Sequence, residues 1–110
     1  MSKYDIDLIR GDTLAFGFAV EGIAEVDAAY FSVKNTVTDT EYVLQKTLNN
    51  GIEKVEDGKY SVRVAPSDTH NLELGNYYYD LQIDKNGDVF TILNGQIRLA
   101  ADITREVNNG

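Results

Sequence analysis

The segment from Asp84 to Asp88 places side-chain oxygens at a spacing that could bind calcium. Asp84, Asn86 and Asp88 occupy the first, third and fifth positions of an EF-hand-like loop. Such a loop needs glycine at its sixth position and a bidentate glutamate at its twelfth, where this chain has Val89 and Gly95. The segment is therefore interpreted as a hairpin turn, and no metal site is expected.

The other candidates for chemistry have simpler structural interpretations. His70 is the only histidine, so the sequence offers no histidine pair for a metal site or for base catalysis, and a solvated loop position is expected. Arg10-Gly11-Asp12 matches an adhesion tripeptide but is expected to form a turn. Four carboxylates could pair as in glycosidases, yet acidic residues are frequent here and tryptophan, the usual sugar platform, is absent. Those carboxylates are Asp39, Glu41, Glu53 and Glu56. No catalytic or cofactor-binding residue is predicted.

The composition restricts the class of protein further. A chain of 110 residues suits one domain, and we expect that domain to span residues 1–107 with a frayed tail at 108–110. The absence of cysteine excludes disulfides, thiol nucleophiles and cysteine-ligated zinc. A net charge of −8 disfavours binding to nucleic acid or to an anionic membrane surface. The sequence has neither the apolar run of a signal peptide nor that of a membrane span, so we expect a soluble protein made in the cytoplasm.

Apolar residues alternate with a period of two along most of the chain, which predicts an all-β fold. The segment 66–74 breaks this pattern and predicts a turn or one short helical turn between two sheets, with Leu72 and Leu74 plugging the open end. The central strands should bury Phe16, Phe18, Phe31, Tyr79, Leu81 and Ile83. Further inward positions are Ile6, Leu8, Leu14, Val20, Ala29, Val33, Tyr42, Leu44, Leu48, Tyr60, Val62 and Val64.

The dipeptide Asn86-Gly87 predicts a two-residue type I′ hairpin, because both residues tolerate positive φ. That turn would place Ile83 opposite Phe90, and Leu81 opposite Ile92. The apolar residues beyond position 96 have the other parity, so we expect a β-bulge at Asn94-Gly95. With this bulge, one inward face holds Tyr77, Tyr79, Leu81, Ile83, Phe90, Ile92, Ile97 and Leu99.

Three consecutive tyrosines, Tyr77 to Tyr79, lie within the same predicted strand. Tyr77 is placed where immunoglobulin-like sandwiches carry a tyrosine whose hydroxyl bonds back to the crossing loop. Tyr79 should bury its ring with its hydroxyl reaching an edge. Tyr78 should point outward, as should Tyr30, and such amphipathic rings are common at binding surfaces. Tyr78 and Tyr30 are therefore the candidate protein interface.

Four segments carry a resemblance to a known family. They are Ile-x-Leu-x-Arg-Gly-Asp-Thr at 6–13, Pro-Ser-Asp-Thr at 66–69, Gly-x-Tyr-x-Tyr-Asp-Leu-Gln at 75–82 and x-Gly-x-Ile-x-Leu at 94–99. In this order and spacing, the chain resembles the immunoglobulin-like domain of tailed-bacteriophage virion proteins. It is similar in particular to the N-terminal domain of phage baseplate upper proteins, over almost its whole length.

The resemblance implies an immunoglobulin-like, two-sheet antiparallel β-sandwich of about seven to eight strands. It also implies a non-enzymatic structural or adaptor protein of a phage or prophage particle, associated with the tail or baseplate and located in the virion. The implied partners are other virion proteins or further copies of the chain, with no cofactor, nucleic acid, membrane or small-molecule substrate. The alternatives are a module that binds host-surface carbohydrate and a capsid decoration protein.

Overall fold

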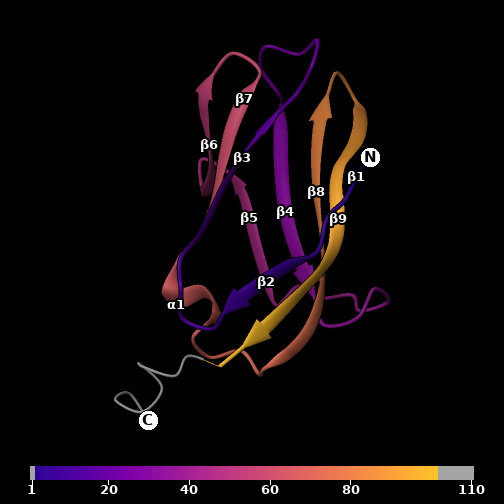
Figure 1. The fold of residues 1–110 in the computed structure, drawn as a ribbon. Helices are drawn as coiled ribbons and strands as arrows, with labels where there is room; N and C mark the ends of the chain where they lie inside the picture. Colours follow the sequence, from indigo (N-terminus) through magenta and orange to yellow (C-terminus); the bar gives the residue numbers. More distant parts are fainter. Residues whose placement is uncertain (1, 102–110) are drawn as a thin grey trace.

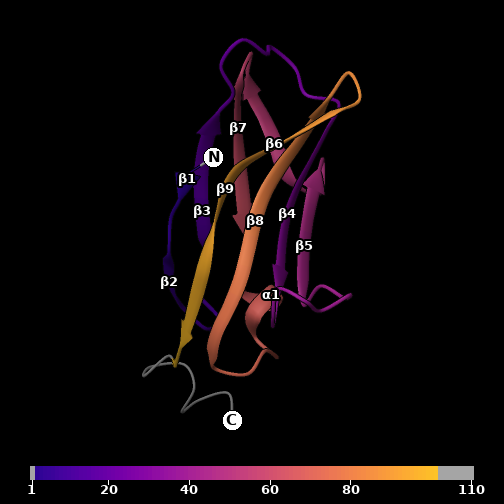
Figure 2. The ribbon, with the colours of Figure 1, turned by 90° about the vertical axis from the view of Figure 1, so that its right-hand side faces the viewer.

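The structure is a computed structural model that describes residues 2–101, and its strands form two layers (Figures 1 and 2). The expected domain end at residue 107 and the frayed tail at 108–110 lie outside the described residues. The elements are β1 (Ser2–Lys3), β2 (Ile6–Ile9), β3 (Leu14–Ala19), β4 (Ala28–Lys34), β5 (Leu44–Leu48), β6 (Gly51–Glu56), β7 (Lys59–Val64), α1 (Pro66–Thr69), β8 (Gly75–Lys85) and β9 (Asp88–Ala100).

The larger layer contains β9, β8, β4 and β5, and β1 and β2 pair in turn with β9. The smaller layer contains β6, β7 and β3. A short β5–β6 pairing links the two layers into one hydrogen-bonded path. This arrangement is an immunoglobulin-like β-sandwich, in which β3, β7 and β6 take the places of strands B, E and D, and β4, β8 and β9 those of C, F and G. The expected fold class is thereby confirmed, although the pairings of β1 and β2 with β9, and of β5 with β6, are parallel.

The core follows the alternation of the sequence. Phe18, Phe31, Leu81 and Ile83 are buried as predicted, and so is Tyr79. The inward positions of β2, β4 and β7 are buried as well, and α1 is the short helical turn expected after β7. Leu72 packs against the core from the connection between α1 and β8.

Some residues expected inside are more exposed than predicted: Leu14, Phe16, Leu44, Leu48 and Ile92 are half-buried, and Tyr42, Leu74 and Phe90 are exposed. Phe16 is half-buried because β3 ends its sheet and leaves one side of the ring without a neighbouring strand. Phe90 is exposed because β9 has no outer neighbour there, since β1 first pairs at Leu93. Tyr42 and Leu74 are exposed because they precede β5 and β8 and lie in connections outside the sheets.

The β8–β9 hairpin has the predicted turn but a different bulge. Asn86 and Gly87 have φ of 54° and 85°, as a type I′ turn requires, and Ile83 pairs with Phe90. The prediction that the bulge lies at Asn94-Gly95 is wrong. Leu81 pairs with Leu93 and Gln82 with Thr91, so the extra residue is Ile92. The prediction that β9 contains one extra residue is confirmed. The alternation of apolar residues alone did not show where that residue lies.

Gly95 is required for a different reason, which is the close passage of the N-terminal segment. A Cβ at Gly95 would overlap the carbonyl oxygen of Tyr4 and would come within 2.9 Å of Asp5 Oδ1. The Tyr4 amide donates to the Asn94 carbonyl at 2.8 Å, and the Gln96 amide donates to Asp5 Oδ1 at 3.0 Å. The glycine thus lets the chain cross from β1 to β2 along β9.

Two buried tyrosines anchor connections to the sheets. The Tyr77 hydroxyl donates to the Glu73 carbonyl at 2.6 Å, which confirms the predicted tyrosine corner. The Tyr79 hydroxyl reaches the edge, as predicted, where it donates to the Tyr4 carbonyl at 2.5 Å. In each case a ring in the core holds a segment that precedes a strand.

An aromatic cluster joins the two layers through the core. The Phe31 ring lies 5.8 Å from the Phe16 ring in an edge-on contact and 5.5 Å from the Tyr79 ring. These residues come from β3, β4 and β8, so the cluster connects the smaller sheet to the larger one. Aromatic pairs at this separation add to the stabilisation that burial alone gives.

We expect Phe31→Ala to lower the free energy of unfolding by about 3–5 kcal/mol, because it leaves a cavity at the centre of this cluster. Urea titration followed by circular dichroism measures the change. Phe90→Ala is the control, since its ring is 45% exposed and should cost far less. Equal effects of the two substitutions would contradict the central place of Phe31.

We expect Gly95→Ala to destabilise the protein by about 1–3 kcal/mol, as overpacking does, because the new methyl group overlaps the Tyr4 backbone. Gly17→Ala is a matched control in another strand, where the nearest atom would be 3.4 Å away. Hydrogen exchange should show lost protection at Ile6–Ile9 in the first variant alone. Retained protection there would exclude the proposed role of Gly95 in seating the N-terminal strand.

Candidate functional site

The outward face of β4 and β8 carries a row of polar and aromatic side chains. Antiparallel pairing sets Tyr78 beside Lys34, Asp80 beside Ser32, and Gln82 beside Tyr30. Alternate residues of a strand share a face, so these six side chains lie on the side opposite the core. Tyr78 and Tyr30 therefore both point outward, as the sequence predicted, and they lie on neighbouring strands with Asp80 and Ser32 between them.

This face is hollowed into a groove of about 720 Å³. One wall comes from Lys3 and the adjacent part of β9, and the other from β5 and the connection before it. The volume lies within the range of roughly 300–1,000 Å³ typical of ligand clefts. The lining residues are Lys3, Tyr30, Ser32, Lys34, Val37, Tyr42, Gln45, Tyr78, Tyr79, Asp80, Gln82, Asn94, Gly95 and Gln96.

Both candidate interface tyrosines line the groove. Tyr78 is 36% exposed, and Tyr30 is half-buried. Tyr42 contributes a third ring on the wall, where the Lys34 ammonium lies 5.2 Å from the ring centroid. That contact is a cation–π interaction, and it holds Lys34 toward the wall. The tyrosines thus form parts of a concave site instead of a flat apolar patch.

The floor of the groove is polar and partly hydrogen-bonded. Gln45 Nε2 donates to Ser32 Oγ at 3.0 Å. Gln82 Nε2 lies 3.3 Å from Asp80 Oδ2 and 3.3 Å from Thr91 Oγ1. Burial raises the pKa of Asp80, and the positive charge of Lys34 opposes that shift. The floor therefore offers amide donors and acceptors around one partly desolvated carboxyl group.

Asp80, Gln82 and Gln45 were not singled out from the sequence as site residues. Strand alternation already placed Asp80 outward beside Tyr78, so the signal for its position was present. Its contact with the groove depends on which strands lie on either side. That information comes from the pairing of β8 with β4 and β9.

The other sequence candidates remain apart from the groove. Arg10-Gly11-Asp12 forms a turn in which the Asp12 amide donates to the Ile9 carbonyl at 3.0 Å, as expected. His70 is exposed at the end of α1, also as expected. None of these residues, nor any of the four carboxylates considered for glycosidase chemistry, lines the groove. Those carboxylates are Asp39, Glu41, Glu53 and Glu56.

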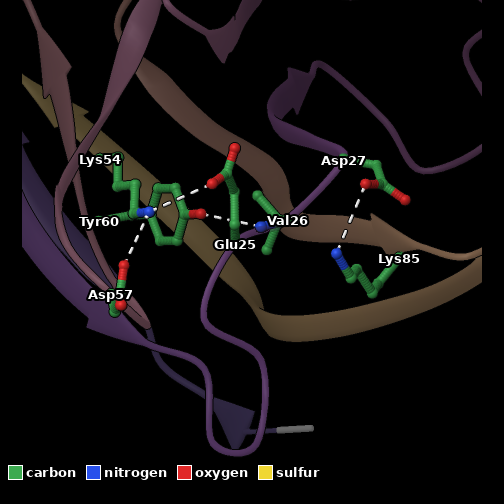
Figure 3. Close-up of polar contacts among 7 residues, drawn as sticks. All are labelled: Glu25, Val26, Asp27, Lys54, Asp57, Tyr60 and Lys85. Atoms are coloured by element: carbon green, nitrogen blue, oxygen red, sulfur yellow. Dashed lines mark hydrogen bonds and ion pairs between the residues drawn. The ribbon is translucent and has the colours of Figure 1, made fainter.

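At one end of the sandwich, polar contacts fix the connection between β3 and β4 (Figure 3). The buried Tyr60 hydroxyl accepts a hydrogen bond from the Val26 amide at 2.8 Å. Lys54 lies between Asp57 and Glu25, with N–O distances of 2.9 and 3.4 Å. The hydrogen bond with Asp57 is the main cause that raises the pKa of Lys54.

A further tie at this end joins the same connection to the β8–β9 hairpin. Asp27 Oδ2 accepts a hydrogen bond from the Asn86 amide at 2.8 Å. Lys85 Nζ lies 3.7 Å from Asp27 Oδ1 (Figure 3). The Asp27 carboxylate therefore positions the hairpin turn. Within residues 2–101, no group of three or more histidine or acidic side chains is arranged to hold a metal ion.

No protein-family model and no curated protein matches this chain. Among solved structures, it is similar to CopC from Methylosinus trichosporium OB3b, with a TM-score of 0.52 and 10% identity over 88% of this chain and 84% of that one. It is also similar to the extracellular domain of the voltage-gated sodium channel beta4 subunit, with a TM-score of 0.45 and 11% identity over 92% and 93% of the two chains. A third match is to the ZIG-8–RIG-5 IG1–IG1 heterodimer, with a TM-score of 0.41 and 11% identity over 91% and 82%.

The similarity to CopC indicates a shared fold and nothing about activity. No helix in the described part of the chain has the length and apolar character needed to cross a membrane. The side chains that line the candidate site offer aromatic rings, amides and one carboxyl group with which to bind a ligand.

We expect Asp80→Asn to raise the free energy of unfolding at pH 7. The pKa of Asp80 is raised in the folded state, so the protonated form of Asp80 favours folding. This contribution to stability is present below the ordinary pKa of 3.8 and is lost as pH rises through the pKa of the folded state. Asparagine has nearly the same shape as aspartate but lacks the half-buried negative charge, so the stability gained by Asp80→Asn should disappear below pH 3.8. Urea titrations at both pH values measure this, with exposed Asp88→Asn as the control for lost negative charge. A gain in stability that is the same at both pH values would contradict a raised pKa of Asp80.

Proposed function

We propose that this domain is a non-enzymatic structural or adaptor component of a phage or prophage particle, acting through protein–protein contacts at the groove. The observation that carries the proposal is the placement of Tyr78 and Tyr30 in one concave surface on rigidly paired strands. Tyrosine supplies large contact area at small entropic cost, because only two side-chain torsions become fixed. A partner protein can therefore bind here without reordering the domain.

The assignment to a phage particle rests on the sequence resemblance, and residues that carry this resemblance contact one another in the domain. The Gly11 amide donates to Thr69 Oγ1 at 2.9 Å, and Arg10 Nη1 donates to the Leu72 carbonyl at 3.2 Å. The opening motif is thus bound to the crossing that contains α1, next to the tyrosine corner of β8. Because these motifs contact one another, their shared order is consistent with a common domain design.

A module that binds carbohydrate is the second candidate, and the groove is the observation that favours it. Tyrosine rings and planar amides such as Gln45 and Gln82 can contact the faces and hydroxyl groups of a sugar. The groove thus supplies rings in place of the missing tryptophan. This candidate predicts binding to a glycan without retention on particles.

We expect Tyr78→Ala to weaken association with particles while leaving the melting temperature nearly unchanged. An exposed side chain usually changes stability by no more than about 0.5 kcal/mol, whereas an interface anchor contributes about 2 kcal/mol or more to binding. Co-purification with particles and light scattering of the isolated protein measure association. Tyr4→Ala is the matched control, because its ring is 63% exposed and does not line the groove.

Equal association of Tyr78→Ala and the unmodified domain would remove Tyr78 from the interface. A domain that stays monomeric, is absent from particles and binds a glycan would replace the adaptor function with the second candidate.

A further inference from the structure

Asp80 is a half-buried carboxylate on the groove floor with unused capacity to accept hydrogen bonds. It receives one long hydrogen bond, from Gln82 Nε2 at 3.3 Å. No ion pair involving Asp80 occurs within 4.0 Å among the described residues. An ionised carboxylate offers about four acceptor positions, so most of them remain available to a ligand.

Lys34, the cation that acts electrostatically on Asp80, does not form an ion pair with it. Lys34 lies close enough to influence Asp80 electrostatically, yet its ammonium is held over the Tyr42 ring. A charge removed from water without a close partner costs free energy. A group that donates hydrogen bonds from the ligand side would offset that cost at the floor of the groove.

We propose that the groove receives an arginine side chain from the partner protein, with its guanidinium group on Asp80 between Tyr78 and Tyr30. The inference rests on the proposed function, since it names the chemistry by which a protein partner is recognised. In this proposal Asp80 determines specificity, and the rings of Tyr78 and Tyr30 position the ligand from either side of Asp80.

Arginine fits this set of groups better than lysine does. Its planar guanidinium group donates two parallel hydrogen bonds to a carboxylate and stacks on aromatic rings. Tyrosine and arginine are, with tryptophan, the residues that most often dominate the binding energy of protein interfaces, whereas lysine is depleted there. The net charge of −8 also attracts a basic partner toward this domain over long range.

Lys34 and Lys3 repel a cationic ligand. Removing the charge of Lys34 should therefore strengthen the binding of arginine, which is the opposite of the effect expected for Asp80→Asn. Lys34 lines the groove beside Tyr78 and acts electrostatically on Asp80, so its charge repels an incoming guanidinium group. Replacing Lys34 by methionine preserves much of the apolar stem and removes the charge. If arginine is the ligand, Lys34→Met should bind it more tightly, whereas Asp80→Asn should bind it more weakly.

The test titrates the isotopically labelled domain with N-acetyl-arginine amide and follows its backbone amides by NMR. Saturable shifts should occur along β8 around Asp80 and along β4 around Ser32. The uncharged citrulline analogue should bind about tenfold more weakly, as should arginine to Asp80→Asn, in keeping with the loss of a charge-assisted pair. Asp88→Asn is the control, because it removes an exposed carboxylate outside the groove.

Equal binding of the arginine and citrulline compounds, or unchanged binding by Asp80→Asn, would overturn the inference. So would saturable shifts with maltohexaose in the absence of shifts with arginine. Retention on particles separates this result from the proposed function. If Tyr78→Ala is lost from particles and Asp80→Asn is retained as well as the unmodified domain, the adaptor function stands and the arginine site is wrong.

Discussion

The contact of Phe31 with Phe16 and Tyr79 is the interaction on which the two-layer arrangement depends. Antibody domains join the corresponding strands with a disulfide packed against a tryptophan, and their second cysteine follows the corner tyrosine by two residues. Here Tyr79 follows Tyr77 by two residues, and Phe31 lies on the strand that would carry the tryptophan. Aromatic packing thus occupies the place of a covalent link in a chain without cysteine.

The same contact determines the outer surface. With Tyr77 and Tyr79 directed into the core, Tyr78 must face outward, because consecutive residues of a strand alternate. The Tyr79 hydroxyl also holds the Tyr4 carbonyl, which places the N-terminal segment along β9 and brings Lys3 to the groove wall. Formation of the core therefore positions both the outward side chains of β8 and one wall of the candidate site.

Local patterns predicted the parts of this fold that depend on neighbouring residues. The type I′ turn at Asn86-Gly87 and the inward parity of β8 follow from residue types a few positions apart. The position of the bulge does not, because Ile92 and Asn94 are both compatible with a change of parity. Gly95 suggested the wrong position because its real requirement is the passage of Tyr4, which is distant in sequence. The groove escaped prediction for the same reason, since its walls come from strands that pair across the chain.

The groove can vary in chemistry more freely than the core beneath it. Register in β8 is determined by inward residues such as Leu81 and Ile83 and by the hairpin turn, so Asp80 is not needed to align the strands. A half-buried carboxylate at such a position opposes folding at neutral pH, as the direction of its pKa shift indicates. A side chain that reduces stability and does not align the fold is the kind that binding sites contain, because function there competes with stability. Asp80 thus points to a ligand through its cost to the stability of the domain as well as through its position in the groove.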